Sequence, residues 1–125
     1  MILDTNALSA FADGSPEAVA AVGKADRVAI PVIVIGEYRY GIAQSHRRLR
    51  YEDWLTGFLA TCEALDITMD TAVEYAAIQV ALRRAGTPIP SNDIWIAALC
   101  RQHDLPVLSR DRHFDRVKGL RRLKW

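Results

Sequence analysis

Short apolar runs alternate along the chain with longer stretches in which apolar residues recur every three or four positions. The short runs predict strands at 1–3, 27–30, 64–67, 106–108 and near 120–123. The longer stretches predict helices over 5–12, 15–24, 31–45, 46–62, 70–85 and 92–103. Short strands that alternate with helices indicate an α/β fold, a three-layer sandwich in which helices cover both faces of a central parallel sheet of four or five strands.

Local signals mark several of these helices. Ser15–Glu17 supplies a capping serine, a first-position proline and a first-turn acid, so a helix is expected to begin there. Gly86 follows the apolar pattern of 70–85, and glycine readily takes the left-handed conformation that ends a helix. The helix over 46–62 is expected to bury one stripe, made of Leu49, Trp54, Leu55, Phe58, Leu59 and Cys62.

The size and composition fit one domain. With 125 residues, half of them hydrophobic, the chain can bury one core, and we expect a single domain over 1–125. No apolar run reaches membrane length and no signal-peptide pattern opens the chain, which predicts a cytoplasmic protein without a membrane partner. Cys62 and Cys100 have no CxxC spacing and lie in apolar helical surroundings, so both are expected to be reduced core thiols.

Acidic residues stand where the predicted strands end or helices begin. Asp4 directly follows the first apolar run, and Asp111 closes the run that begins at Pro106. Asp93 lies in the first turn of the helix over 92–103. In open parallel sheets the carboxyl ends of the strands share one edge, which is the usual place for chemistry. Each of these three acids has a plain alternative, as a helix cap or a first-turn acid that complements the helix dipole.

Glu37 differs, because it interrupts an apolar stretch in the middle of a predicted helix. A buried carboxylate must be paired, protonated or bound to a metal ion, and Arg39 is the nearest candidate partner in sequence. If Glu37 projects toward the same edge as the three aspartates, their mutual repulsion calls for a divalent cation. Carboxylate oxygens favour Mg²⁺ or Mn²⁺ over zinc.

Short polar residues flank these acids. Supporting roles, in orienting the carboxylates or holding metal-bound water, are predicted for Thr5, Asn6, Asn92 and Ser109, although each also suits a turn or cap. Asp115 would join the pocket if the turn after Asp111 folds back. His113 is interpreted as an exposed turn residue rather than a ligand.

Thirteen Arg against three Lys make the basic side chains suited to bidentate phosphate contacts, although a GC-rich coding bias gives the same composition. The net charge of +1 excludes a generally basic nucleic-acid binder, so any contact with nucleic acid must come from local patches. Two basic patches are candidates, one over residues 46–50 and the other over the tail from Arg110 to Lys124. A solvated helix face or a charged terminus explains either patch equally well. The residues of these patches expected to contact nucleic acid are Arg47, Arg48, Arg50, Arg110 and Arg112.

Four segments together resemble the PIN-domain ribonucleases, above all the stand-alone VapC toxins of bacterial toxin–antitoxin pairs. They are Asp4-Thr5-Asn6, Glu37, the run Ser91–Ala98 and the run Ser109–Phe114. The resemblance implies a PIN fold and a Mg²⁺- or Mn²⁺-dependent endoribonuclease, with Asp4, Glu37, Asp93 and Asp111 around the metal. It also implies a homodimer and a cognate antitoxin whose C-terminal segment enters the active-site groove. For the homodimer, the helix over 46–62 and the stripe Tyr75, Ile78 and Leu82 offer apolar surface, unless that surface is core.

Rival functions remain open at the level of sequence. A phosphoacceptor signalling domain also has an acidic Mg²⁺ pocket, but it needs a lysine at the end of a later strand, and Lys24, Lys118 and Lys124 are misplaced for that. A PIN-like module that binds RNA without cutting it would have no use for the complete acid set. A nuclease that processes RNA without an antitoxin is separated from a toxin by its neighbouring gene.

Overall fold

The computed structural model describes residues 1–125 and contains one sheet of five parallel strands. Along the sheet the strands run in the order β3, β2, β1, β4, β5. Their bounds are Ile2–Leu3 for β1, Ala29–Pro31 for β2, Glu63–Leu65 for β3, Val107–Leu108 for β4 and Arg122–Leu123 for β5. The predicted α/β fold with a parallel sheet is confirmed.

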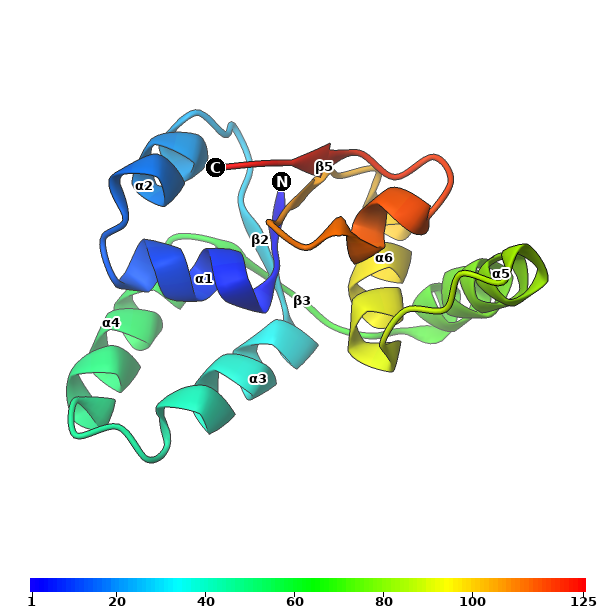
Figure 1. The fold of residues 1–125 in the computed structure, drawn as a ribbon. Coiled ribbons are helices and arrows are strands. Elements are labelled where there is room, and N and C mark those ends of the chain that lie inside the picture. The colour runs from blue at the N-terminus through cyan, green and yellow to red at the C-terminus, as the bar shows by residue number, and fades with distance from the viewer.

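Helices lie on both sides of this sheet (Figure 1). On one side are α1 (Thr5–Ala12), α2 (Pro16–Gly23), α3 (Val32–Ile42) and α4 (Arg48–Leu59). On the other side are α5 (Met69–Ala85), α6 (Ser91–His103) and the short 3₁₀ helix η1 (Arg112–Arg116). No helix is both long and apolar enough to cross a membrane.

The centre of the sheet joins the two ends of the chain. β1 pairs with β4 in the register Ile2 with Val107 and Leu3 with Leu108, and all four side chains are fully buried. The next residues along these two strands are Asp4 and Ser109, which are also buried. The parallel register therefore carries a carboxylate and a hydroxyl to the same edge of the sheet from positions 105 residues apart.

β5 supports this edge from the outside. The backbone N–H of Ser109 donates to the carbonyl of Leu123 at 3.0 Å, and the Arg122 guanidinium donates to the carbonyl of Ser109 at 3.1 Å. β5 thus fixes the backbone of Ser109 through one hydrogen bond to its N–H and another to its carbonyl.

Most predicted helix bounds are confirmed within a few residues. Gly86 ends α5 with φ of 66°, the left-handed conformation expected from its position. The helix predicted over 46–62 is shorter, and the expected burial of Leu49 is wrong, because that side chain is 72% exposed. Leu49 lies in the first turn of α4, which projects beyond the sheet, whereas Leu55 in the middle of the helix is fully buried.

The stripe on α5 belongs partly to the core. Ile78 and Leu82 are buried and Tyr75 packs against the core, its ring stacked on Trp95 of α6 with centroids 4.0 Å apart. These contacts assign the stripe to the α5–α6 interface within one chain. The thiol of Cys100 is buried and that of Cys62 half-buried, and both are free.

Candidate metal centre

The four predicted acids line one cavity at the carboxyl edge of the sheet. The cavity has a volume of about 320 Å³. Its lining residues come from the end of β1, from α1, α3 and α6 and from the segment after β4, and they are Asp4, Thr5, Asn6, Glu37, Tyr40, Asp93, Ile96 and Asp111. None of the four acids forms an ion pair with a lysine or arginine in the structure. Their charge is therefore left for a cation from outside the chain.

Asp4 is the most buried of these acids, with 4% of its surface exposed. It caps α1, because one oxygen accepts a hydrogen bond from the N–H of Ala7 at 2.7 Å. Its other oxygen accepts from the hydroxyl of Ser109. Burial raises the pKa of Asp4 to about 6, the two hydrogen bonds oppose that rise, and the neighbouring Asp93 and Asp111 add to it. Asp4 is therefore both the cap of α1 and a lining residue of the cavity.

Asp93 and Asp111 approach each other across the mouth of the cavity. Asp93 stands in the first turn of α6, and Asp111 caps η1 by accepting from the N–H of His113 at 2.8 Å. Burial raises the pKa of Asp93, a hydrogen bond from His113 opposes the rise, and the charge of Asp111 adds to it. Carboxylates that are both desolvated and close together are destabilised as anions, and a divalent ion removes that cost.

Glu37 is half-buried, so the expectation of a fully buried carboxylate is wrong. Its two oxygens accept hydrogen bonds from the hydroxyl of Thr5 and, at 2.6 Å, from the amide of Asn92. Arg39 does not pair with it, because Arg39 turns to Glu52 on α4 at 3.3 Å. Two neutral donors thus orient Glu37 toward the cavity without cancelling its charge.

The predicted supporting residues divide into two groups. Thr5 and Asn6 line the cavity, Asn92 holds Glu37, and Ser109 joins Asp4 to the loop of Asp111, whose N–H donates to the Ser109 hydroxyl at 2.9 Å. Asp115 does not join them. Its carboxylate is exposed and forms a bidentate pair with Arg122 at 2.7 and 2.6 Å, because η1 carries it away from the cavity.

The expectation that His113 is an exposed turn residue is wrong. Its ring is half-buried, and Nδ1 lies 3.0 Å from an oxygen of Asp93 and 3.0 Å from an oxygen of Asp111. The position two residues after a capping aspartate is the one whose N–H that aspartate accepts, and this local signal places His113 beside Asp111. The contact with Asp93 comes from the packing of η1 against α6 and has no signal in the sequence.

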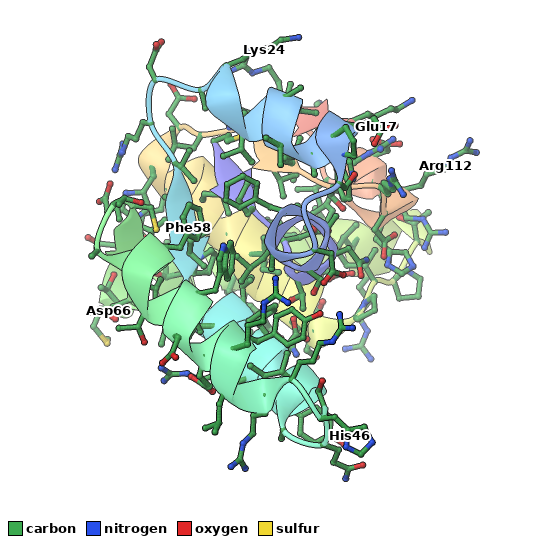
Figure 2. The ribbon with its side chains drawn as sticks, turned by 90° about the vertical axis from the view of Figure 1, so that its left-hand side faces the viewer. Glu17, Lys24, His46, Phe58, Asp66 and Arg112 are labelled. Atoms are coloured by element: carbon green, nitrogen blue, oxygen red, sulfur yellow. The ribbon has the colours of Figure 1, made fainter.

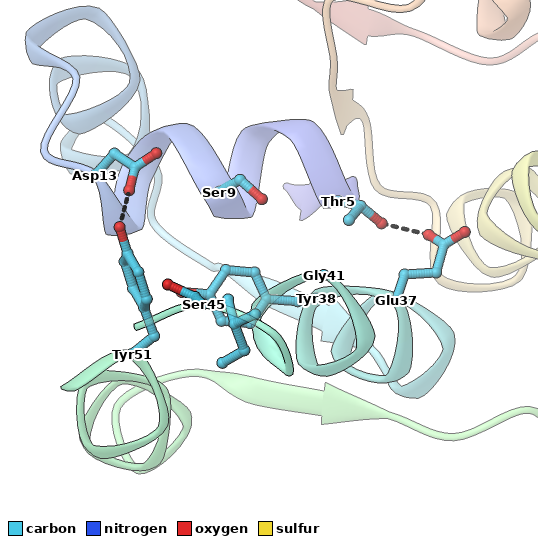
Figure 3. Close-up of a pocket in the computed structure, with 9 residues that line it drawn as sticks. Thr5, Ser9, Asp13, Glu37, Tyr38, Gly41, Ser45 and Tyr51 are labelled. Carbon is cyan, nitrogen blue, oxygen red and sulfur yellow. Dashed lines mark hydrogen bonds between the residues drawn. The ribbon is translucent and has the colours of Figure 1, made fainter. Parts of the chain in front are cut away.

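A second cavity, of about 260 Å³, runs between α1 and α3 (Figure 3). At one end Thr5 donates to Glu37, and at the other end the hydroxyl of Tyr51 donates to Asp13 at 2.9 Å. Thr5 and Glu37 line both cavities, so this groove leads away from the acidic centre. Arg47 and Arg50 line a further hollow beside Tyr51, while Arg48 is exposed.

The other basic patch surrounds a separate cavity of about 250 Å³. Its lining consists of Arg110, Arg112, Arg122, Lys124 and Trp125. The guanidinium of Arg110 lies over the Trp125 ring, 4.7 Å from its centroid. Figure 2 shows Arg112 reaching into solvent well away from His46, which marks the turn before α4. The two predicted basic patches are therefore separate surfaces.

A parallel α/β sheet with carboxylates gathered at its carboxyl edge defines a class of protein whose chemistry depends on a divalent ion bound there. The donor set fits such an ion, since oxygen donors converge on the cavity and no guanidinium or ammonium group neutralises them. Within this class, the chain belongs to the PIN domain family, which it matches over residues 1–120.

Several ribonucleases are similar to this chain over most of their length. The chain is 31% identical to ribonuclease VapC5 of Mycobacterium tuberculosis, over 94% of this chain and 87% of that protein. It is 31% identical to the tRNA(fMet)-specific endonuclease VapC of Salmonella typhimurium, over 79% of this chain and 76% of that protein. The crystal structure of DNA-bound VapBC from Salmonella typhimurium aligns with a TM-score of 0.88 and 29% identity, covering 99% of this chain and 96% of that chain.

Ser109→Ala is expected to weaken divalent-ion binding by about 10- to 100-fold, the usual cost of losing a group that orients metal ligands. The change removes the donor to Asp4 and the acceptor for the N–H of Asp111, so both acids lose their shared anchor. Isothermal titration with Mn²⁺ measures the effect. Thr56→Ala, which removes a hydroxyl from the exposed face of α4, is the matched control. Equal affinities for the two variants would show that Ser109 does not organise the centre.

Proposed function

We propose that this protein is a metal-dependent endoribonuclease and the toxin of a toxin–antitoxin pair. The proposal is carried by one observation above all: four carboxylates from separate segments line one cavity, and no lysine or arginine pairs with any of them. The family membership and the VapC relatives support it. Asp4, Glu37, Asp93 and Asp111 are the proposed ligands and catalytic residues, and Mg²⁺ or Mn²⁺ is the proposed cofactor.

The side chains of this chain hold the centre in a fixed form. Ser109 and the N–H of Ala7 fix Asp4, while Thr5 and Asn92 fix Glu37, so the carboxylates need little rearrangement to receive an ion. A divalent ion bound there lowers the pKa of a water and stabilises the charge that develops on a phosphodiester. Hydrolysis by water leaves a 5′ phosphate and a 3′ hydroxyl. Only one histidine, His113, lies at the centre, so no histidine pair is available to activate a ribose 2′ oxygen.

The two basic surfaces, one around Arg47 and Arg50 and the other around Arg110 and Arg112, suit the backbone of single-stranded or looped RNA. Arg110 and Arg112 are the sequence neighbours of Asp111, and together with Lys124 they line the separate cavity beside Trp125. Arg122 is less available, since Asp115 occupies its guanidinium. In the other surface, Arg47 and Arg50 lie beyond the groove between α1 and α3, with Arg48 next to them. RNA held by both surfaces would cross the four acids.

The proposed antitoxin would compete for the same place. The groove between α1 and α3 opens onto the acidic cavity through Thr5 and Glu37, so a peptide lying in it reaches the carboxylates. An arginine or lysine presented at that end would neutralise them in place of the metal ion. The VapBC structures aligned with this chain support a partner of this kind.

Cleavage of RNA by the purified protein, with Mg²⁺, with Mn²⁺ or with EDTA, tests the proposed activity. A pool of folded transfer RNAs supplies both loops and single strands, and ligation of the products identifies their ends. We expect cleavage only in the presence of a divalent ion, with products that carry a 5′ phosphate and a 3′ hydroxyl. Cleavage that persists in EDTA, cyclic phosphate ends, or intact RNA under all conditions would each contradict the proposal.

A further inference from the structure

The side chain of His113 turns toward the acidic centre and has no other partner. Its Nδ1 lies 3.0 Å from one oxygen of Asp93 and 3.0 Å from one oxygen of Asp111. The three residues offer ligand atoms that all lie within 4.8 Å of one another. The imidazole thus lies beside two of the proposed ligands, at a position where the sequence favours an exposed turn residue over a ligand.

The backbone holds the ring in this place. The N–H of His113 donates to one oxygen of Asp111 at 2.8 Å, which leaves the other oxygen facing Nδ1. The following residue, Phe114, is fully buried and anchors η1 against the core. Because His113 lies between a cap and a core anchor, its Nδ1 reaches the centre without any change of the backbone.

The distances match those of neighbouring ligands on a metal ion. In an octahedral site with bonds of about 2.1 Å, adjacent ligand atoms are about 3.0 Å apart. Nδ1 has this separation from both carboxylate oxygens. A hydrogen bond has a similar length, so the preference of the centre for one metal ion over another is what distinguishes ligation from hydrogen bonding.

We propose that Nδ1 of His113 is a ligand of the same metal ion as Asp93 and Asp111, which makes the centre a mixed oxygen–nitrogen site that favours Mn²⁺ over Mg²⁺. The inference rests on the metal centre of the proposed function and extends it with a nitrogen ligand. Mg²⁺ is bound almost entirely by oxygen, whereas imidazole is a good ligand for first-row transition metals. Replacement of the imidazole therefore weakens Mn²⁺ binding more than Mg²⁺ binding.

Pulsed electron paramagnetic resonance of the Mn²⁺-loaded wild-type protein tests ligation directly, because a coordinated imidazole imposes a ¹⁴N modulation on the manganese signal. We expect this modulation in the wild type, a change to the ¹⁵N pattern in protein labelled with ¹⁵N-histidine, and its loss in His113→Gln. His46→Gln is the matched control, since His46 is exposed in the turn before α4. The wild-type spectrum decides the question even if His113→Gln folds poorly.

Calorimetric titrations with each ion give a second readout. We expect His113→Gln to raise the Kd for Mn²⁺ by about tenfold or more and to raise the Kd for Mg²⁺ much less, because Mg²⁺ is bound by oxygen and the glutamine amide still offers an oxygen. Bound Mn²⁺ without nitrogen modulation, or equal weakening for both ions, would overturn the histidine ligand and leave the nuclease proposal standing. A wild-type protein that binds neither ion would overturn both.

Discussion

Replacing Asp4 with asparagine is expected to lower the rate of RNA cleavage by about a thousandfold and, at the same time, to stabilise the metal-free protein. The loss of activity follows from the loss of a carboxylate at the centre of the proposed site. The gain in stability follows from burial, which raises the pKa of Asp4 to about 6. An ionised carboxylate in this place costs folding free energy, and a neutral amide of the same shape does not.

The sign of the pH dependence follows from the same shift. In the unfolded chain Asp4 has its ordinary pKa of 3.8, so the folded protein binds this proton more tightly than the unfolded chain does. The contribution of Asp4 to the free energy of unfolding is therefore largest below pH 3.8 and falls as the pH rises through about 6. At pH 7 the asparagine variant is expected to avoid a cost on the order of 1–3 kcal/mol.

Thermal melts in EDTA and in excess Mg²⁺ measure this prediction. In EDTA at pH 7 the midpoint of Asp4→Asn is expected to lie several degrees above that of the wild type, and the gap to close near pH 4. Added Mg²⁺ is expected to raise the midpoint of the wild type more than that of the variant. Asp26→Asn, at the opposite edge of the sheet and exposed, is the control and should change neither activity nor stability. An Asp4→Asn protein that retains cleavage would remove Asp4 from the active site.

The second large effect is expected from Phe114→Ala, which should lower the free energy of unfolding by about 3–5 kcal/mol. Phe114 is fully buried and is the largest side chain that η1 contributes to the core. Its removal leaves a cavity beneath the turn that carries Asp111 and His113. We therefore expect weaker Mn²⁺ binding under conditions in which the variant is still folded.

Urea unfolding followed by far-ultraviolet circular dichroism measures the stability change, with the slope expected to stay constant while the midpoint falls. Phe114→Leu is the matched control, because leucine fills most of the space and should cost far less. If Phe114→Ala unfolds at the same urea concentration as Phe114→Leu, η1 is not anchored by this ring.

The sequence was sufficient to predict the sheet and the place of the acids, because both depend on local patterns and on one general property of parallel sheets. Asp4 follows an apolar strand, and Gly86 follows an apolar helix, and each stands in the structure where that pattern put it. Glu37 was identified because it interrupts an apolar stretch. The structure brings these acids into one cavity, and their catalytic roles stay predictions.

The remaining features depend on contacts between segments that no local pattern describes. The partner of Asp115 is Arg122, on a strand that begins only after η1 has turned away from the cavity. The contact between His113 and Asp93 joins positions 20 residues apart across the α6–η1 interface. Leu49 fits the apolar stripe of its helix, but the helix extends past the core there. In each case the direction of one element relative to another decides the outcome.

The pairing of β5 with Ser109 has a practical consequence for anyone who handles this protein. Arg122, near the C-terminal end, supports the carbonyl of the residue whose hydroxyl binds Asp4. A two-residue edge strand is the part of a sheet that opens most readily. Removal of residues 122–125 is therefore expected to disturb the carboxylate of Asp4, at the end of the first strand.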